Sequence, residues 1–186
     1  DRSVSRGLGD VYKRQLLNGK NEKYVLKNAF LTAEGAVTAL ENENADSLID
    51  KNILIIGYGR IAKALHRLLA AYGSNITVCS RSAESAELSS FYGASHIYFP
   101  ELKKKNDFDI VINTVPHIVL TEAELKALKK SVIILDLASF PGGADTLMAA
   151  SLGLKIINGR GMPSKFTAKA AGEAIGCAAD EIIRQL

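Results

Sequence analysis

The residues best suited to chemistry form a glycine turn at positions 57–62, which reads Gly-Tyr-Gly-Arg-Ile-Ala. Gly57 permits a tight turn, Gly59 lets a ligand approach the backbone because it has no Cβ, and Ala62 is small enough for close packing of the next helix. The first amides of that helix, together with its dipole, attract phosphate groups. The turn therefore predicts a dinucleotide site, and its expected contact residues are Gly57, Tyr58, Gly59, Arg60 and Ile61.

A second polar group, Ser80-Arg81-Ser82, follows the next apolar segment and bears on which dinucleotide binds. Sites for NAD carry an Asp or Glu about 20 residues beyond the glycines, where it binds the ribose hydroxyls. No acid stands here. Arg81 can instead pair with a 2′-phosphate, and Ser80 and Ser82 can donate to the same phosphate. This pattern favours NADP over NAD, and the alternative is that Arg81 is an ordinary solvated loop residue.

Three further loops follow predicted strand ends, where ligands bind in parallel sheets. The first could line the nicotinamide ribose and consists of Asn113, Thr114, Val115 and Pro116. The second, residues 136–143, ends in Pro-Gly-Gly and could form an anion-binding concavity from backbone amides. The third, residues 159–172, places Arg160, Lys165 and Lys169 near a helix start, where they suit carboxylates. Each loop also has an ordinary interpretation, as a strand exit, a tight turn or a solvated basic loop.

These residues need a scaffold that brings strand ends to one edge of a sheet. Six short apolar segments alternate with helical patterns, which predicts an α/β fold with a doubly wound parallel sheet, the Rossmann fold, in strand order 3-2-1-4-5-6. The expected strands lie near residues 52–56, 76–80, 96–99, 109–113, 132–136 and 154–157. The expected helices lie at 32–40, 61–72, 82–92, 121–128, 144–151 and 167–185, with a Thr121–Glu124 capping box at the fourth.

The chain divides into four expected parts. Residues 1–15 have little apolar periodicity, and we expect a non-native tail derived from adapter sequence, with a natural disordered tail as the alternative. Residues 16–49 would be the remnant and connecting helix of a missing N-terminal domain. Residues 50–166 would form the NADP-binding domain. Residues 167–186 would form a C-terminal helix that packs back on the domain interface, so the chain is expected to be truncated.

Composition argues against several classes of protein. The chain has 186 residues and a net charge of +3, of which residues 1–15 contribute +2, so it carries no basic footprint for nucleic acid. No apolar run approaches the roughly 20 residues needed to span a bilayer. Cys79 and Cys177 are expected to be buried thiols in a reducing cytoplasm, and they lack zinc-site spacing. We expect a cytoplasmic protein without a bound metal.

The motifs, taken in order, resemble the A subunits of dipicolinate synthase from about Asn28 to the C-terminus. The most specific part is Asp-Leu-Ala-Ser followed by Pro-Gly-Gly, at residues 136–143. Departures occur in the last loop, where Ala168 and Ala170 replace the usual Pro and Thr. The resemblance implies an NADP-dependent oxidoreductase that converts dihydrodipicolinate to dipicolinate in sporulation. It also implies a small dicarboxylate substrate, a flavoprotein-like B subunit as partner, and a homo-oligomer.

The resemblance and the loops together suggest a substrate site. No catalytic residue is assigned, and the candidates are Asp136, Ser139 and Lys165; the expected substrate-binding residues are Gly142, Gly143, Arg160, Pro163 and Lys165. His117 is expected at the rim, whereas His66 and His96 are expected to have no catalytic role. Two alternatives stay open. One is a 2-hydroxyacid or shikimate-type dehydrogenase, whose catalytic His or Lys–Asp pair we do not find. The other is a regulatory domain that binds NADP without chemistry.

Overall fold

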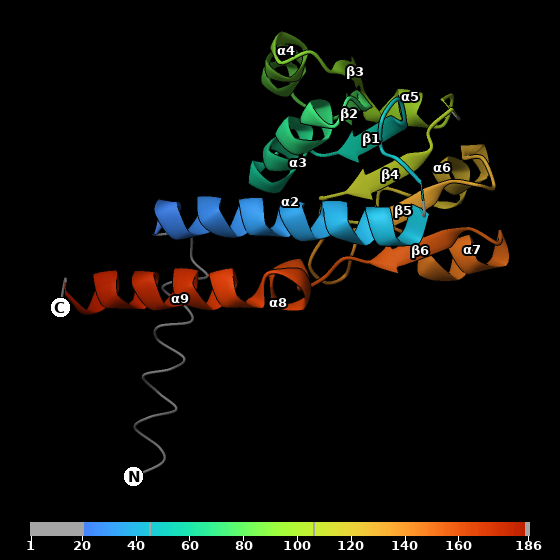
Figure 1. Cartoon of the computed structure of the whole chain (residues 1–186). Coiled ribbons are helices and arrows are strands. Elements are labelled where there is room, and N and C mark those ends of the chain that lie inside the picture. The colour runs from blue at the N-terminus through green and yellow to red at the C-terminus, as the bar shows by residue number, and fades with distance from the viewer. Residues whose placement is uncertain (1–20, 45, 106, 185–186) are drawn as a thin grey trace.

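The computed structural model describes residues 21–44, 46–105 and 107–184, so the prediction for residues 1–15 lies outside the described part. Six parallel strands form one sheet in the order β3-β2-β1-β4-β5-β6, which confirms the predicted Rossmann topology (Figure 1). Apolar β-branched residues dominate the strands, as expected where both faces of a parallel sheet are covered. Their bounds are β1 Asn52–Ile56, β2 Asn75–Cys79, β3 Ser95–Ile97, β4 Ile110–Asn113, β5 Ile133–Asp136 and β6 Lys155–Asn158.

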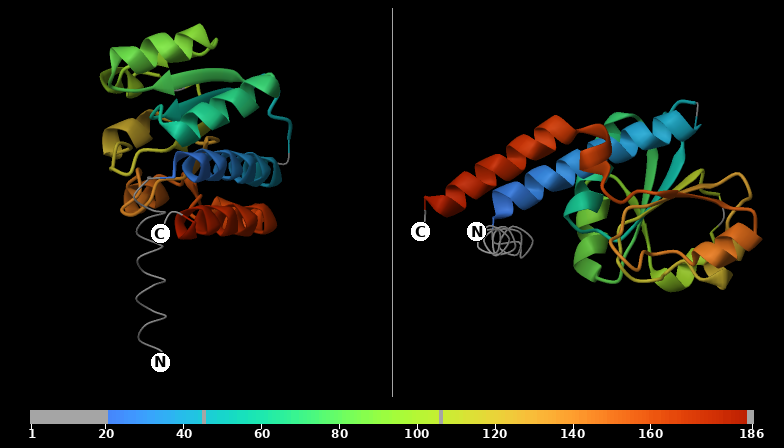
Figure 2. Two further views of the ribbon diagram at one scale, coloured as in Figure 1. Left: turned by 90° about the vertical axis from the view of Figure 1, so that its left-hand side faces the viewer. Right: turned by 90° about the horizontal axis from the view of Figure 1, so that it is seen from below.

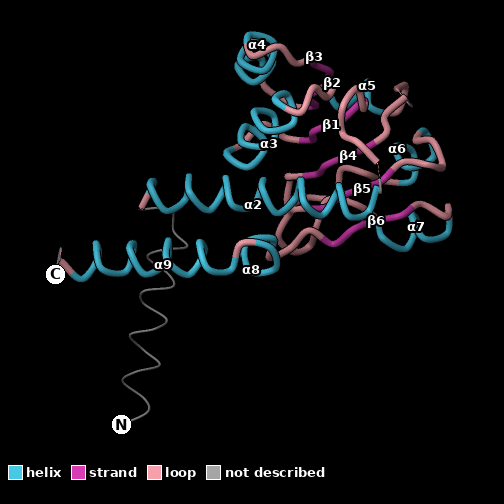
Figure 3. The backbone as a smooth tube through the Cα atoms, in the orientation of Figure 1, coloured by secondary structure: helices cyan, strands magenta, loops and turns pink. Residues whose placement is uncertain are grey.

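Helices cover both faces of the sheet and make a three-layer arrangement (Figure 2). On one side lie α2 (Glu22–Asn44), α3 (Arg60–Ala71), α4 (Ala83–Phe91), α8 (Met162–Phe166) and α9 (Ala168–Ile183). On the other side lie α5 (Phe99–Leu102), α6 (Glu122–Ala127) and α7 (Thr146–Ser151). The tube in Figure 3 shows the short loops that join strand ends to helices along one edge of the sheet. These loops carry the predicted site residues.

Two apolar cores explain why the sheet is the centre of the fold. Ile53 and Ile55 of β1 point into the core beneath α2 and α3, whereas Leu54 and Ile56 point into the core beneath α5, α6 and α7. All four are fully buried. Alternate residues of a strand face opposite sides, so a continuous apolar strand can serve both layers. This double burial fixes the register of β1, and with it the position of the glycine turn that follows.

Helix α2 is longer than predicted, since it begins at Glu22 and ends at Asn44, whereas we expected a helix over 32–40 only. It runs antiparallel to α9, and the two helices project together beyond the sheet (Figure 1). Asn21 and Lys23 donate to the Glu181 carboxylate at 2.8 and 3.0 Å, which ties the two helices together. Contacts between segments so distant in sequence are invisible to local periodicity, which is why the first turns of α2 were missed.

Three other expectations needed correction. The third strand ends at Ile97, and Phe99 begins the short helix α5 with Pro100 in its first turn, where proline is tolerated. Within the predicted loop 159–172, Met162–Phe166 forms the short helix α8, which was not predicted, whereas α9 begins at Ala168 in agreement with the predicted helix 167–185. Cys79 is buried as predicted, but Cys177 is exposed on α9.

Candidate functional site

The glycine turn lies between β1 and α3, and its two glycines are needed for different reasons. Gly57 has a φ of +90°, and a Cβ there would stand 2.6 Å from Thr114 Oγ1. Its amide donates to the Cys79 carbonyl at 2.8 Å, which holds the turn against β2. A Cβ on Gly59, in contrast, would meet nothing within 4 Å. Gly59 is the N-cap of α3 and no side chain caps this helix end, so its first amides remain free to receive an anion.

A cleft of about 780 Å³ opens beside this turn, at the switch point between β1 and β4. It is lined by three groups that lie far apart in the sequence: the glycine turn, the end of β2 and the loop after β4. Its lining residues are Gly57, Tyr58, Gly59, Ser80, Arg81, Ser82, Ser85, Phe99, Thr114, Val115, Pro116, His117 and Val119. The volume falls within the range typical of cofactor sites. The structure thus brings most of the predicted cofactor-binding residues into one cleft, with His117 exposed in its lining as expected.

The end of β2 gives the cleft its charge. Arg81 is exposed, and no carboxylate lines the cleft among the described residues. Ser80 is buried, and its hydroxyl lies 2.9 Å from His96 Nε2. Ser82 caps α4 by accepting from the Ser85 amide at 3.1 Å. Arg81 fits a 2′-phosphate, since it offers a cation there and no described acid lines the cleft. The predicted donation from Ser82 is corrected, because its hydroxyl already donates to Ser85 Oγ at 2.8 Å.

Three of the predicted cofactor residues lie outside this cleft. Arg60 and Ile61 line a smaller pocket of about 260 Å³ next to it, shared with Val25 and Asn28 of α2. Arg60 forms an ion pair with Glu22 at 2.8 Å. Asn113 is fully buried, so its position does not support the predicted contact with the cofactor. Its side chain holds the loop after β4, because Nδ2 donates to the Val115 carbonyl and Oδ1 accepts from the Val115 amide.

Six lining residues were missed: Ser85, Phe99 and Val119 in the cleft, and Val25, Asn28 and Ala29 of α2 in the smaller pocket. Phe99 follows β3, and Val119 lies two residues beyond His117 in the loop after β4. A search of every strand exit, instead of only the polar ones, would have found both. Asn28 lies on α2, and no local signal connects it with the glycine turn.

Asp136 organises the loop after β5 and is buried. Its Oδ1 accepts from Asn113 Nδ2 at 2.8 Å and from the Ala138 amide at 3.1 Å, and its Oδ2 accepts from the Gly143 amide at 2.8 Å. The Gly142 amide donates to the Ser139 carbonyl at 2.8 Å. Both glycine amides are therefore used within the loop. The prediction that these amides hold a substrate carboxylate is therefore wrong, because both amides already donate within the protein. Their hydrogen bonds instead hold the loop in its shape.

The remaining candidates for substrate binding lie around this loop. Arg160 is exposed, donates from Nε to the Ala138 carbonyl at 3.2 Å, and lies over the Phe140 ring. The exposed Lys165 donates to the Asn158 carbonyl at 3.2 Å, while Pro163 lies in the first turn of α8. Ser139 is exposed in the loop after β5. Arg160 thus lies in the connection between β6 and α8 and Lys165 lies on α8, where each keeps charge available to an anion.

Burial explains the behaviour of two titratable groups near the site. Burial raises the pKa of the Cys79 thiol to about 12, so this thiol stays protonated near neutral pH and is a poor nucleophile. Burial lowers the pKa of His66, which favours its neutral form. In the described part of the chain, no three His, Cys, Asp or Glu side chains gather as a metal site would require. Nor is any described helix long and apolar enough to cross a membrane.

Comparison with known proteins first gives the class. Residues 19–139 match the model of the family described as D-isomer specific 2-hydroxyacid dehydrogenase, NAD binding domain. The chain belongs to this family, and it is a nicotinamide-dinucleotide-binding domain of the dehydrogenase type.

The comparison then narrows within the class. The A subunit of dipicolinate synthase from Bacillus subtilis is 28% identical over 94% of this chain and 59% of the relative. The solved structure of the dipicolinate synthase A subunit from the same species superposes with a TM-score of 0.86 and 27% identity, over 90% of this chain and 56% of that one. The protein from Bacillus halodurans gives a TM-score of 0.83 at 26% identity, over 89% and 56%. The predicted resemblance is confirmed.

Another group of relatives consists of shikimate dehydrogenases (NADP(+)). The protein from Methanococcus maripaludis strain C6 is 32% identical over 85% of this chain and 59% of the relative. The chain therefore spans about three fifths of the length of these first curated relatives. The matched family model and the shikimate dehydrogenases (NADP(+)) support a nicotinamide cofactor.

Proposed function

We propose that this chain is the NADP-binding part of an oxidoreductase that oxidises dihydrodipicolinate to dipicolinate, like the dipicolinate synthase A subunits it resembles. One observation carries the proposal: the cleft joins an open helix N-terminus at Gly59 with the exposed Arg81, and no described carboxylate lines it. The pyrophosphate of NADP would bind at the helix N-terminus, and its 2′-phosphate would bind at Arg81. NAD lacks the 2′-phosphate that Arg81 is placed to bind.

NADP⁺, when bound, would supply the hydride acceptor. The chain would hold the pyrophosphate at Gly59 and the first turn of α3, and the 2′-phosphate at Arg81. The exposed edge of residues 114–116 would lie beside the nicotinamide ribose. Oxidation removes a hydride and a proton from the dihydropyridine ring, and the proton would leave to water. The product ring is aromatic, which gives the reaction a large driving force. The protein's contribution would then be mainly orientation and electrostatics, so no strong base is required.

Arg160 and Lys165 are the groups proposed to hold the substrate carboxylates. Both are exposed and point charged atoms toward the loops after β5 and β6. Because their present acceptors are neutral backbone carbonyls, a carboxylate would be a stronger partner for each. The proposed partners are a B subunit and a second copy of the chain. This proposal rests only on the resemblance to dipicolinate synthase A subunits.

The activity is tested by assaying dihydrodipicolinate-dependent NADPH formation with the upstream coding sequence restored and the B subunit co-expressed. We expect turnover, and we expect Lys165→Gln to raise KM by roughly tenfold through loss of one charge-assisted hydrogen bond. Lys104→Gln, which removes an exposed lysine near α5, is the matched control and should leave KM unchanged. Tight NADP⁺ binding without turnover in the restored protein would favour the regulatory alternative.

A second candidate substrate, shikimate, calls for a parallel assay because relatives named shikimate dehydrogenase match most of the chain. We expect no shikimate-dependent NADPH formation from the restored protein. Turnover of shikimate in place of dihydrodipicolinate would overturn the substrate assignment while leaving the cofactor assignment intact.

A further inference from the structure

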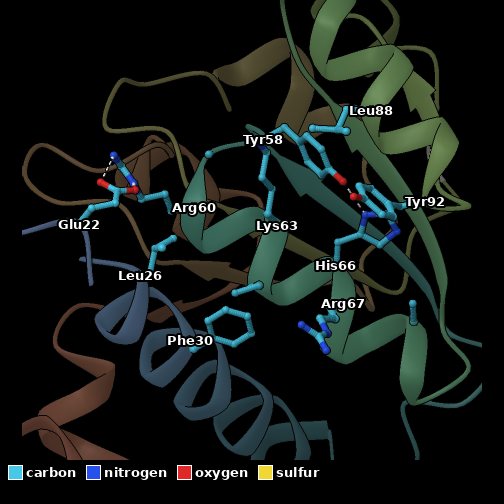
Figure 4. Close-up of a pocket in the computed structure, with 13 residues that line it drawn as sticks. Glu22, Leu26, Phe30, Tyr58, Arg60, Lys63, His66, Arg67, Leu88 and Tyr92 are labelled. Atoms are coloured by element: carbon cyan, nitrogen blue, oxygen red, sulfur yellow. Dashed lines mark hydrogen bonds and ion pairs between the residues drawn. The ribbon is translucent and has the colours of Figure 1, made fainter. Parts of the chain in front are cut away.

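A second cleft, of about 920 Å³, lies beside the glycine turn (Figure 4). It is enclosed by α2, by the outer face of α3, and by Leu88 and Tyr92 at the end of α4. Tyr58 and Gly59 border both clefts. The cofactor uses the backbone of this turn in the proposed function, whereas the Tyr58 side chain points into the second cleft (Figure 4).

The floor of this cleft is apolar and uncharged. Tyr58 is 9% exposed and His66 3%, and the Tyr58 hydroxyl lies 2.9 Å from His66 Nδ1. This pair satisfies its own polar atoms, and burial lowers the pKa of His66 away from the charged form. A ligand in the cleft therefore meets two rings whose planes are tilted by 52° and whose polar atoms are already paired, so they do not demand a polar partner.

The walls of this cleft carry large apolar side chains that are exposed to solvent. Leu26 and Phe30 of α2 are 44% and 42% exposed, and Tyr92 on the opposite wall is 64% exposed. Exposed apolar groups that face each other across a hollow are typical of binding sites rather than of ordinary surface.

The rim carries the charge. Lys63 and Arg67 follow each other on one face of α3, both are exposed, and neither forms an ion pair with a carboxylate of the described chain. Lys63 lies over the Tyr58 ring at 5.7 Å. Arg60 is already paired with Glu22, the acid in the lining. The unneutralised charge at the rim is therefore positive.

We propose that this second cleft binds a small organic anion, with a flat apolar body packed between Phe30 and Tyr92 and an acidic group paired with Lys63 and Arg67. Charge complementarity selects this occupant over the chain's own N-terminal segment. Residues 1–20 contain five basic and two acidic residues, and would bring positive charge to a positive rim. The site is distinct from the proposed catalytic function, since it needs neither turnover nor NADP.

The test is a fluorescence titration of the 186-residue chain with anilinonaphthalene sulfonate, an aromatic anion, at saturating NADP⁺. We expect one saturable site per chain that NADP⁺ does not displace. The double substitution Lys63→Gln and Arg67→Gln should weaken binding by roughly tenfold, because two charge-assisted contacts are lost. Lys103→Gln with Lys104→Gln removes the same charge elsewhere and should have no effect. Phenylnaphthylamine, which lacks the sulfonate, should bind more weakly than the anion.

A steric variant gives a second readout. Ala70 lines the cleft at an exposed position of α3, so Ala70→Phe should fill the space without disturbing the core and should abolish probe binding. Displacement of the probe by NADP⁺, equal affinity in the charge-deficient double variant, or unchanged binding to Ala70→Phe would each overturn the proposal. So would a concentration-dependent dimer that Ala70→Phe dissociates, since a second copy would then be the occupant.

Discussion

The glycine turn after β1 and the loop after β5 lie at the same edge of the sheet, yet they use their glycines in opposite ways. A Cβ on Gly59 would meet nothing within 4 Å, whereas a Cβ on Gly143 would overlap the side-chain amide of Asn113. The first amides of α3 have no side-chain cap, whereas the Gly143 amide donates to Asp136. One glycine keeps space open for a ligand, and the other makes room for the protein itself. Two loops that each contain a pair of glycines thus differ in whether their amide donors are free.

Gly143→Ala should break the closed loop and give the largest effect. The new methyl group would overlap Asn113 and force apart the contacts that Asn113 makes with Asp136 and Val115. We expect the free energy of unfolding to fall by about 3 kcal/mol or more, as for overpacking combined with lost buried hydrogen bonds. Unfolding in urea measures this change in the free energy of unfolding. The matched control is Gly176→Ala in α9, where a Cβ meets nothing and stability should hold or rise slightly. Equal stability of both variants would contradict this account.

Asp136→Asn should weaken the same loop less severely. The carboxylate accepts hydrogen bonds at both oxygens, so an amide in its place would turn an N–H toward the donor of Asn113 or of Gly143. We expect a loss of about 2 kcal/mol in the free energy of unfolding. Asp145→Asn is the control, because Asp145 caps α7 and Asn caps equally well. A loss at Asp145 that matches the loss at Asp136 would remove the special role of the buried carboxylate.

Gly59→Ala should test the open turn, with little effect on folding. The backbone of Gly59 has ordinary extended geometry and its surroundings are empty, so stability should change by no more than about 1 kcal/mol. The methyl group would stand where the pyrophosphate is proposed to approach, and the NADP⁺ dissociation constant should rise by roughly tenfold or more. Gly57→Ala should instead lower stability itself, because it clashes with Thr114 at a positive φ. Calorimetric titration and thermal unfolding separate the two outcomes.

The contrast between the loops also explains what sequence could predict. The strand order and the position of the glycine turn followed from apolar segments that must be buried on both faces, a requirement that local pattern records. The use of the Gly142 and Gly143 amides did not follow, since it depends on where Asp136 and Asn113 meet across β4 and β5. A motif predicts where amides are exposed along the chain, and only the packed neighbours decide whether those amides are already occupied.

The same reasoning applies to α2. Its middle showed a helical pattern because it packs on the core, but its first turns are stabilised by Glu22 with Arg60 and by Lys23 with Glu181. These partners lie far away in sequence. The pocket between Asn28 and the glycine turn depends on that placement and was therefore missed.

We propose that the open cleft prefers NADP to NAD, and the most direct test is a calorimetric titration of this chain with NADP⁺ and NAD⁺. We expect NADP⁺ to bind at least about tenfold more tightly, because Arg81 pairs with the 2′-phosphate. Arg81→Asp should reverse this preference, since a carboxylate at that position would repel the phosphate and accept from the ribose hydroxyls of NAD⁺. Tighter binding of NAD⁺ by the unaltered chain, or an unchanged preference in Arg81→Asp, would contradict the account.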